Sequence, residues 1–335
     1  MVRILLRLVI AFILTKNYYA KEILTMSNPL LEVIGTKYPI LQGAMGGVAY
    51  HQLVAAVSEA GGLGIIASAG MDKETLHEEI RKTRKLTDKP FGVNLMLMSP
   101  NIADMIEVIA EEKVPVVTTG AGNPKPVIEP LHQAGCKVIP VVATARQAAK
   151  MEAAGVDAVV CEGNEAGGHI GTVATMTLTR AVSKAVKIPV VTAGGVADGH
   201  GLAAAFALGA SRAQLGTVLV ASEEAPIADS YKEATVSAQE NSTFEMAREI
   251  GSPIRLLQTK GSDHLQEIID NGGGREDFEP VSLELLVKGA KGDTENGTVT
   301  IGQIAGVVEE VRPVKEILDS MVEEADQVIS SLSIL

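Results

Sequence analysis

One stretch of the sequence, CEGNEAGGHIG at residues 161–171, places a histidine directly after two glycines and close behind an apolar run. An imidazole side chain generally titrates near neutral pH, so a histidine at this place is suited to deliver or remove a proton. Gly167 and Gly168 let the backbone approach a ligand closely. The stretch predicts either a flexible loop with an exposed histidine or a ligand site in which His169 transfers a proton. Glu162 and Glu165 flank the loop and either orient His169 or face solvent.

The rest of the chain offers few other groups for catalysis. Its two cysteines, Cys136 and Cys161, form neither a disulfide framework nor a metal-binding pattern. Cys161 is expected to be a small buried side chain rather than a nucleophile. No Ser–His–Asp set and no H-x-E or C-x-x-C spacing is present, so we expect no metal. The remaining histidines, in stretches that favour solvent exposure, are His51, His77, His132, His200 and His264.

The elements that would position His169 follow a regular alternation. Short runs that are apolar at nearly every residue indicate strands buried on both faces, as in a parallel sheet covered by helices. Eight such strands within residues 39–220 predict an α/β fold, a (β/α)8 TIM barrel. A doubly wound sheet is the alternative, but it requires a G-x-G-x-x-G turn after its first strand. The expected strands are 39–44, 63–68, 91–97, 115–121, 137–144, 157–163, 188–195 and 213–220, with amphipathic segments between them.

The two ends of the chain differ from this pattern. Residues 1–25 combine a basic start with a short apolar run interrupted by Arg7, and Met26 opens an ordinary domain start. We interpret residues 1–25 as a mis-assigned start or a dispensable extension rather than a targeting segment. The barrel is expected over 26–222. Residues 223–335 are expected to be a lid and cap of the same domain, polar and irregular to about 300, without a separate core, and ending in an amphipathic helix near 311–331.

Barrel enzymes carry their sites at the carboxyl ends of the strands, and several of the expected strands end in glycine-rich turns. Barrels bind phosphate groups after strands seven and eight through backbone N–H groups. The glycines of AGGVADG and QLGT at those two places therefore predict a cofactor that carries phosphate. The simpler interpretation, that each glycine only makes a tight turn, explains less well why so many strands end this way.

The first and third strands indicate a flat cofactor. QGAMGG offers backbone with no bulky side chain beyond Met45, which suits a planar ring. Asn94 interrupts an apolar run with an amide that needs a partner, either the polar edge of a heterocycle or neighbouring backbone. The predicted cofactor-binding residues are Gly43, Ala44, Met45, Asn94, Glu162, Gly167, Gly168, Gly194, Gly195, Gln214, Gly216 and Thr217.

Composition and charge exclude several classes of protein. A formal net charge of −12 and an aromatic content of 3% without tryptophan argue against nucleic-acid binding, which uses basic surfaces and aromatic stacking. Beyond the first residues nothing is long and apolar enough to be a membrane span. Two cysteines in 335 residues suit a reducing cytoplasm. We expect a cytoplasmic protein without a membrane partner, with a homodimer as the working hypothesis for its assembly.

At several of these motifs the sequence resembles a known family. PILQGAM, AGGLGIIAS, DKPFGVNLMLMSP, VVTTGAGNP, EAGGHIGTVATMTL, IPVVTAGGVADG and GQIAG are similar, in order over about residues 28–331, to the FMN-dependent enoyl-acyl-carrier-protein reductase II family. The same superfamily contains the nitronate monooxygenases. The resemblance implies a catalytic role for His169 and FMN contacts at Met45, Asn94, Gly194, Gly195, Gly216 and Thr217. Ile170, where nitronate monooxygenases usually carry arginine, is reductase-like. Val218, where the family usually has arginine, implies a weaker contact near the phosphate.

The activity implied by this resemblance is NADH- or NADPH-dependent reduction of trans-2-enoyl thioesters of acyl carrier protein, or of CoA, in fatty acid biosynthesis. The first alternative is oxidation of alkyl nitronates by O2. A nucleotide dehydrogenase barrel would require Cys161 as nucleophile, and a flavin- or acyl-binding protein without turnover is a further alternative. The basic run RKTRK at 81–85 is a candidate docking site for the anionic carrier, although a solvated helix face explains it more simply.

Overall fold

The computed structural model describes residues 34–332, so the interpretation of residues 1–25 lies outside the described residues. Eight parallel strands form a nearly closed barrel in the order β1-β9-β8-β6-β5-β4-β3-β2. A parallel bridge between Leu41 and Leu63 joins the first two strands and closes the circle. The predicted TIM barrel is confirmed. Its strands are β1 (Ile40–Gln42), β2 (Gly64–Ala67), β3 (Phe91–Met96), β4 (Val116–Gly120), β5 (Lys137–Val142), β6 (Val159–Glu162), β8 (Val190–Ala193) and β9 (Arg212–Leu215).

The uniformly apolar strands are explained by burial on both faces. On β2, Ile65 belongs to the cluster inside the barrel, whereas its neighbour Ile66 packs outward under the helices. Val116 and Val117 on β4 divide in the same way. Because successive side chains of a strand point to opposite faces, both faces of the sheet must be apolar here.

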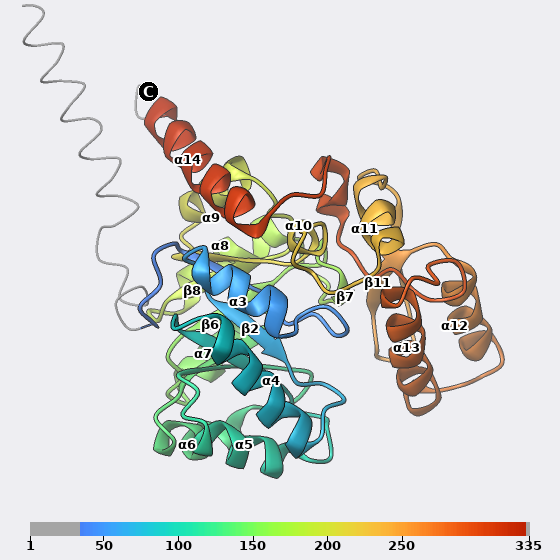
Figure 1. Cartoon of the computed structure of the whole chain (residues 1–335), viewed down its shortest axis with the longest axis horizontal. Helices are drawn as coiled ribbons and strands as arrows, with labels where there is room; N and C mark the ends of the chain where they lie inside the picture. The colour runs from blue at the N-terminus through green and yellow to red at the C-terminus, as the bar shows by residue number, and fades with distance from the viewer. Residues whose placement is uncertain (1–33, 333–335) are drawn as a thin grey trace, which may run out of the picture.

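Helices follow the strands and surround the barrel (Figure 1). Asp72 and Asp198 begin two of them as N-caps, each accepting a backbone N–H three residues later at 2.8 Å. The last helix, α14 (Val314–Leu332), packs against α9 and α3. Within residues 34–332, no helix is both long and apolar enough to cross a membrane. The helices between strands are α3 (His51–Glu59), α4 (Lys73–Leu86), α5 (Ile102–Glu111), α6 (Lys125–Gln133), α7 (Ala145–Glu152), α8 (Thr175–Ala185) and α9 (Gly199–Ala207).

The strand expected at 213–220 was predicted too long. β9 ends at Leu215, and a short helix, α10 (Thr217–Val220), begins directly after Gly216. The run of β-branched and apolar residues at 217–220 resembles a strand in composition. Its side chains are buried in a helical turn against the main apolar cluster instead. Tertiary packing therefore overrides local β-propensity at this position.

Residues 223–300, termed the lid segment below, are more regular than their composition indicated. Besides helices and strands they have their own buried apolar cluster, which includes Phe278, Leu265 and Leu256. The expectation of an irregular tail without a separate core was wrong, because its apolar residues are scattered between turn clusters. The lid segment lies to one side of the barrel (Figure 1). Its elements are α11 (Asp229–Val236), β10 (Thr243–Met246), β11 (Ile254–Leu257), α12 (Lys260–Asp270) and α13 (Arg275–Ala290), followed by the 3-10 helix η1 (Gln303–Val307).

Candidate active site

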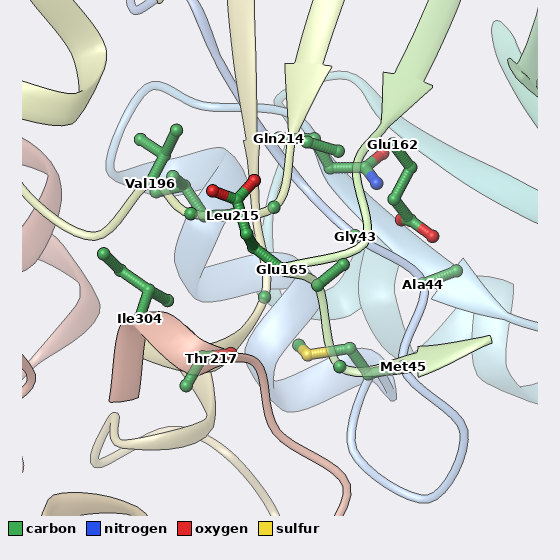
Figure 2. A pocket seen from close by; sticks show the side chains of 16 residues that line it. Gly43, Ala44, Met45, Glu162, Glu165, Val196, Gln214, Leu215, Thr217 and Ile304 are labelled. Atoms are coloured by element: carbon green, nitrogen blue, oxygen red, sulfur yellow. The ribbon is translucent and has the colours of Figure 1, made fainter. Parts of the chain in front are cut away.

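A cavity opens at the carboxyl ends of β1, β6, β8 and β9 (Figure 2). It holds about 500 Å³ of empty space, part of it open to solvent. The lining residues are Gly43, Ala44, Met45, Glu162, Glu165, Ala166, Gly167, Ala193, Gly194, Gly195, Val196, Gln214, Leu215, Gly216, Thr217 and Ile304.

The structure gathers most of the predicted cofactor-binding residues around this cavity. Asn94, Gly168 and His169 are the predicted site residues that do not line it. Sequence reasoning missed Ala166, Ala193, Val196 and Leu215, which sit beside predicted residues within the same motifs. It also missed Ile304, which belongs to the GQIAG motif and reaches the cavity from η1. The predicted residues that line it are Gly43, Ala44, Met45, Glu162, Gly167, Gly194, Gly195, Gln214, Gly216 and Thr217.

Backbone N–H groups provide the main polar character on the β8 and β9 side of the cavity. Gly194 and Gly195 have φ angles of 88° and 71°, a left-handed conformation that favours glycine. Within residues 34–332 the N–H groups of Gly194, Gly195, Val196 and Gly216 have no hydrogen-bond acceptor. Backbone donors are normally paired, so donors that share one cavity and lack partners indicate an anionic ligand. A phosphate group fits this part of the cavity.

Two carboxylates also face the cavity, and Figure 2 shows them pointing apart. An oxygen of Glu165 accepts the backbone N–H of Thr175, at the start of α8, at 2.6 Å. Burial raises the pKa of Glu162 to about 7, although the charge of His169 acts in the opposite direction. Arg255 supplies positive charge beneath the loop, where its Nε donates to the carbonyl oxygen of Asn164 at 2.9 Å. Glu162 is thus the cavity carboxyl whose protonation changes near neutral pH.

The remaining lining residues keep the turns in place. A Cβ on Gly43 would lie 3.3 Å from the side chain of Gln214, which shows how closely the β1 turn approaches β9. The hydroxyl of Thr217 accepts the N–H of Gly302 at 2.9 Å and so ties α10 to the segment before η1. Val218 does not line the cavity and is buried in the main apolar cluster. Met45 lines the cavity from the turn after β1.

Asn94 lies on β3, outside the set that lines the cavity. Its Nδ2 donates to the hydroxyl of Thr118 on β4 at 2.9 Å, so its partner is a side chain on the neighbouring strand and not backbone. No donor to its Oδ1 is found among residues 34–332. This oxygen stays available to a ligand at the mouth of the barrel.

His169 lies in a strand, not in a flexible loop. β7 (Gly168–His169) pairs antiparallel with β11 of the lid segment, and 47% of the His169 side chain is exposed. Its Nε2 lies 3.2 Å from Oε1 of Glu279 on α13 and 3.4 Å from the hydroxyl of Ser252. Burial raises the pKa of Glu279, but the hydrogen bonds with His169 and Ser252 outweigh burial and lower it to about 2. Glu279 is therefore an ionised carboxylate facing the histidine.

The other histidines are paired with carboxylates, so the expectation of simple solvation was incomplete. Half-buried His51 lies 2.8 Å from Glu79, and His77 lies 2.8 Å from Glu112. The remaining pairs are His132 with Asp157, His200 with Glu324 and His264 with Glu267. These contacts hold helices and loops together away from the cavity.

Two further candidates lose their chemical interest in the structure. Cys161 is fully buried, its Sγ lies 3.7 Å from the hydroxyl of Thr179, and burial raises the pKa of its thiol. It is therefore a poor nucleophile. In the basic run at 81–85, Arg81 and Arg84 share the carboxylate of Glu112, and Lys82 pairs with Glu79. Three of its four basic side chains thus already have a carboxylate partner within the protein.

Comparison with known proteins gives consistent matches over nearly the whole chain. The nitronate monooxygenase family matches residues 27–112 and 103–324. A (3aS,4S,5R,7aS)-5-hydroxy-7a-methyl-1-oxo-octahydro-1H-indene-4-carboxyl-CoA dehydrogenase of Rhodococcus jostii is 32% identical over 93% of the chain and 99% of its own length. A nitronate monooxygenase of Paraburkholderia phytofirmans is 36% identical over 67% of the chain and 74% of its own length.

Solved structures show the same likeness. FabK from Thermotoga maritima superposes with a TM-score of 0.88 at 44% identity, covering 92% of the chain and 98% of FabK. A nitroalkane oxidase from Streptomyces ansochromogenes gives a TM-score of 0.80 at 29% identity, covering 90% and 99%.

Proposed function

Because the chain belongs to the nitronate monooxygenase family and is a flavin-dependent oxidoreductase, we propose that it reduces trans-2-enoyl thioesters with NADH or NADPH, using FMN. The observation that carries this proposal is the 44% identity with FabK, an enoyl-acyl-carrier-protein reductase II, over almost all of both chains. The relative from Rhodococcus jostii, named for a carboxyl-CoA substrate, supports a thioester as the substrate class.

The residues of the cavity fit FMN. The free N–H groups of Gly194, Gly195 and Gly216 would hold its phosphate, and the flat turn at Gly43–Met45 would lie against its ring system. The free Oδ1 of Asn94 would accept a hydrogen bond from a polar edge of the ring. Bound FMN would supply hydride transfer between the nicotinamide and the acyl substrate.

The chain itself supplies a proton and orientation. Reduction of an enoyl thioester adds a hydride to the β-carbon and a proton to the α-carbon. His169 follows residues 165–167, which line the cavity. Its backbone pairs with β11 of the lid segment, and its side chain is half exposed. It would give the proton as negative charge develops on the acyl group. No other histidine occurs in residues 161–171.

Nitronate oxidation is the second candidate function. The family match and the relative from Paraburkholderia phytofirmans favour it. An alkyl nitronate is already deprotonated, so this reaction would require no proton transfer to His169, and neither NADH nor NADPH would be consumed. The mechanism of a nucleotide dehydrogenase barrel, which requires a cysteine nucleophile, is disfavoured because Cys161 is buried against α8.

One spectroscopic experiment separates these functions. The protein would be produced from Met26, loaded with FMN and kept anaerobic while the flavin absorbance is followed. Bleaching by NADH or NADPH and recovery on adding crotonyl-CoA or a crotonyl carrier protein would support enoyl reduction. Bleaching by an alkyl nitronate alone would move the protein to nitronate oxidation. A protein that stays colourless and cannot be loaded with FMN would contradict both.

A further inference from the structure

The backbone around His169 is held by the lid segment and not by the barrel. Gly168 and His169 pair with Arg255 and Ile254 on β11. Directly beyond the strand, the N–H of Ile170 donates to the carbonyl oxygen of Pro253 at 3.0 Å. The proton-transfer residue is therefore positioned by residues more than eighty positions further along the chain.

The side chain of His169 is held at one nitrogen. Nε2 lies 3.2 Å from Oε1 of Glu279 and 3.4 Å from the hydroxyl of Ser252, which itself donates to the same carboxylate oxygen. Arg275, one helical turn earlier on α13, donates to that oxygen from its Nε at 3.3 Å. Among residues 34–332, Nδ1 has no hydrogen-bond partner.

Ser252 and Glu279, the two residues of the lid segment that contact His169, are themselves held in place by their surroundings. Ser252 is buried, and its N–H donates to the carbonyl oxygen of Ala247 at 3.0 Å across the turn between β10 and β11. Glu279 follows Phe278, which is fully buried in the lid cluster. The carboxylate is therefore fixed by packing and hydrogen bonds, as an orienting group must be.

We propose that Glu279 is a positioning residue for proton transfer: it holds the imidazole of His169 with Nε2–H toward the lid segment, so that Nδ1 is the nitrogen that exchanges a proton with the substrate. An ionised carboxylate is an acceptor only, so it selects the tautomer that carries hydrogen on Nε2. The proposal deepens the proposed function, on which it rests for the identity of the substrate.

The proton-transfer step of enoyl reduction then balances. In enoyl reduction, once the hydride has reached the β-carbon, protonated Nδ1 gives its proton to the α-carbon and the imidazole is left neutral with Nε2–H. The charged groups around the ring are Glu279 and Arg275 of α13 and Glu162 of β6, whose pKa responds to the histidine's charge.

The tautomer can be measured without any activity. The cofactor-free chain, labelled with ¹⁵N-histidine, would be studied by long-range ¹H–¹⁵N correlation spectra, with His169 assigned from the signal lost in His169→Gln. We expect neutral His169 to carry its hydrogen on Nε2 in the wild type and in Glu279→Gln, which keeps an acceptor oxygen. Glu279→Ala should give a mixture of tautomers. Glu276→Gln, an exposed change on the same helix, should leave the wild-type spectrum unchanged.

Kinetics of the loaded protein provide the second readout. Glu279→Ala should lower kcat for the crotonyl thioester about 10- to 100-fold with KM and FMN affinity unchanged, and Glu279→Gln should recover part of that loss. A wild-type histidine with hydrogen on Nδ1, or an unchanged tautomer in Glu279→Ala, would overturn the proposal. If the wild type turned over neither thioester nor nitronate, the proposed function would fail, whereas the tautomer result would still decide the role of Glu279.

Discussion

The cavity and the histidine beside it are built in different ways. The cavity is formed by strand-end turns of the barrel, and its polar groups include backbone N–H donors that have no partner among residues 34–332. His169 is held by side chains and a strand of the lid segment, and its contacts with Ser252 and Glu279 are already made. The cavity offers donors to a ligand, whereas the lid segment fixes the orientation of the His169 side chain.

We therefore propose that cofactor binding and proton transfer use different parts of this molecule. Two carboxylates illustrate it. Glu162 faces the cavity from β6 and burial raises its pKa to about 7, whereas Glu279 faces His169 and its hydrogen bonds lower its pKa to about 2. Substitutions in one region should therefore leave the function of the other intact.

The largest expected effect tests the proton-transfer region. His169→Ala should lower the rate of enoyl thioester reduction by about 10²- to 10⁴-fold, the usual contribution of a general acid, because His169 is the only histidine of residues 161–171. FMN affinity should not change, since His169 does not line the cavity. Stopped-flow measurement of thioester reduction and a fluorescence titration with FMN give the two numbers. Equal loss of FMN binding would show that the two regions are one.

The next effect tests the cavity. Gly195→Ala places a methyl group 3.6 Å from the carboxyl carbon of Glu165, in the turn whose N–H groups have no acceptor, and the methyl group would crowd a phosphate there. We therefore expect FMN affinity to fall by about tenfold or more. The left-handed conformation costs the alanine roughly 1–2 kcal/mol of stability in addition. Gly135→Ala is the matched control, because Gly135 has φ 84° and a Cβ there would meet nothing within 4 Å.

Calorimetric unfolding and FMN titration would be compared for the two variants. Both should be destabilised to a similar extent, because both place an alanine in the left-handed region. Only Gly195→Ala should lose FMN affinity. Similar FMN affinities in the two variants would show that the turn after β8 does not contact the cofactor.

The same contrast explains how much the sequence could predict. The barrel strands and the glycine turns are local patterns, so their positions were predicted to within a few residues and most of the cavity lining followed from them. Ser252 and Glu279 lie 83 and 110 residues beyond His169 and belong to no motif. Ser252 stands just before β11, which pairs with β7, and Glu279 lies on α13, so both meet the histidine through long-range contacts that no local pattern encodes.

Two other differences have similar causes. The composition of residues 217–220 predicts a strand, but these residues form the short helix α10. Burial, not local propensity, decides their conformation. The apolar cluster of the lid segment is not predicted from the sequence, because its residues are spread over several elements and each element contributes few of them. In both places tertiary packing supplies the information that the local sequence lacks.

A smaller effect concerns the stability of the lid contact. Because the pKa of Glu279 is lowered from 4.5 to about 2 in the folded state, its carboxylate stabilises the protein above about pH 4.5. That stabilisation is lost as pH falls from there toward 2. Glu279→Gln should therefore be less stable than the wild type by about 1–3 kcal/mol near pH 7, with the gap closing in acid. Urea unfolding of the cofactor-free proteins over this range would measure it, and a gap independent of pH would contradict the assignment.

The smallest expected effect has the opposite sign and lies in the cavity. Burial raises the pKa of Glu162 from 4.5 to about 7, so its protonated form favours folding, and that stability is lost as pH rises from about 4.5 through 7. Glu162→Gln keeps the shape but cannot ionise. It should be more stable than the wild type by about 1–2 kcal/mol near pH 8, a discounted figure because the side chain is only partly shielded from solvent, and equal to it near pH 4. The two carboxylate variants thus shift stability in opposite directions over different pH ranges. If Glu162→Gln behaved like Glu279→Gln, the carboxyl of Glu162 would have a stabilising partner, and the contrast between the cavity and the histidine contact would not hold.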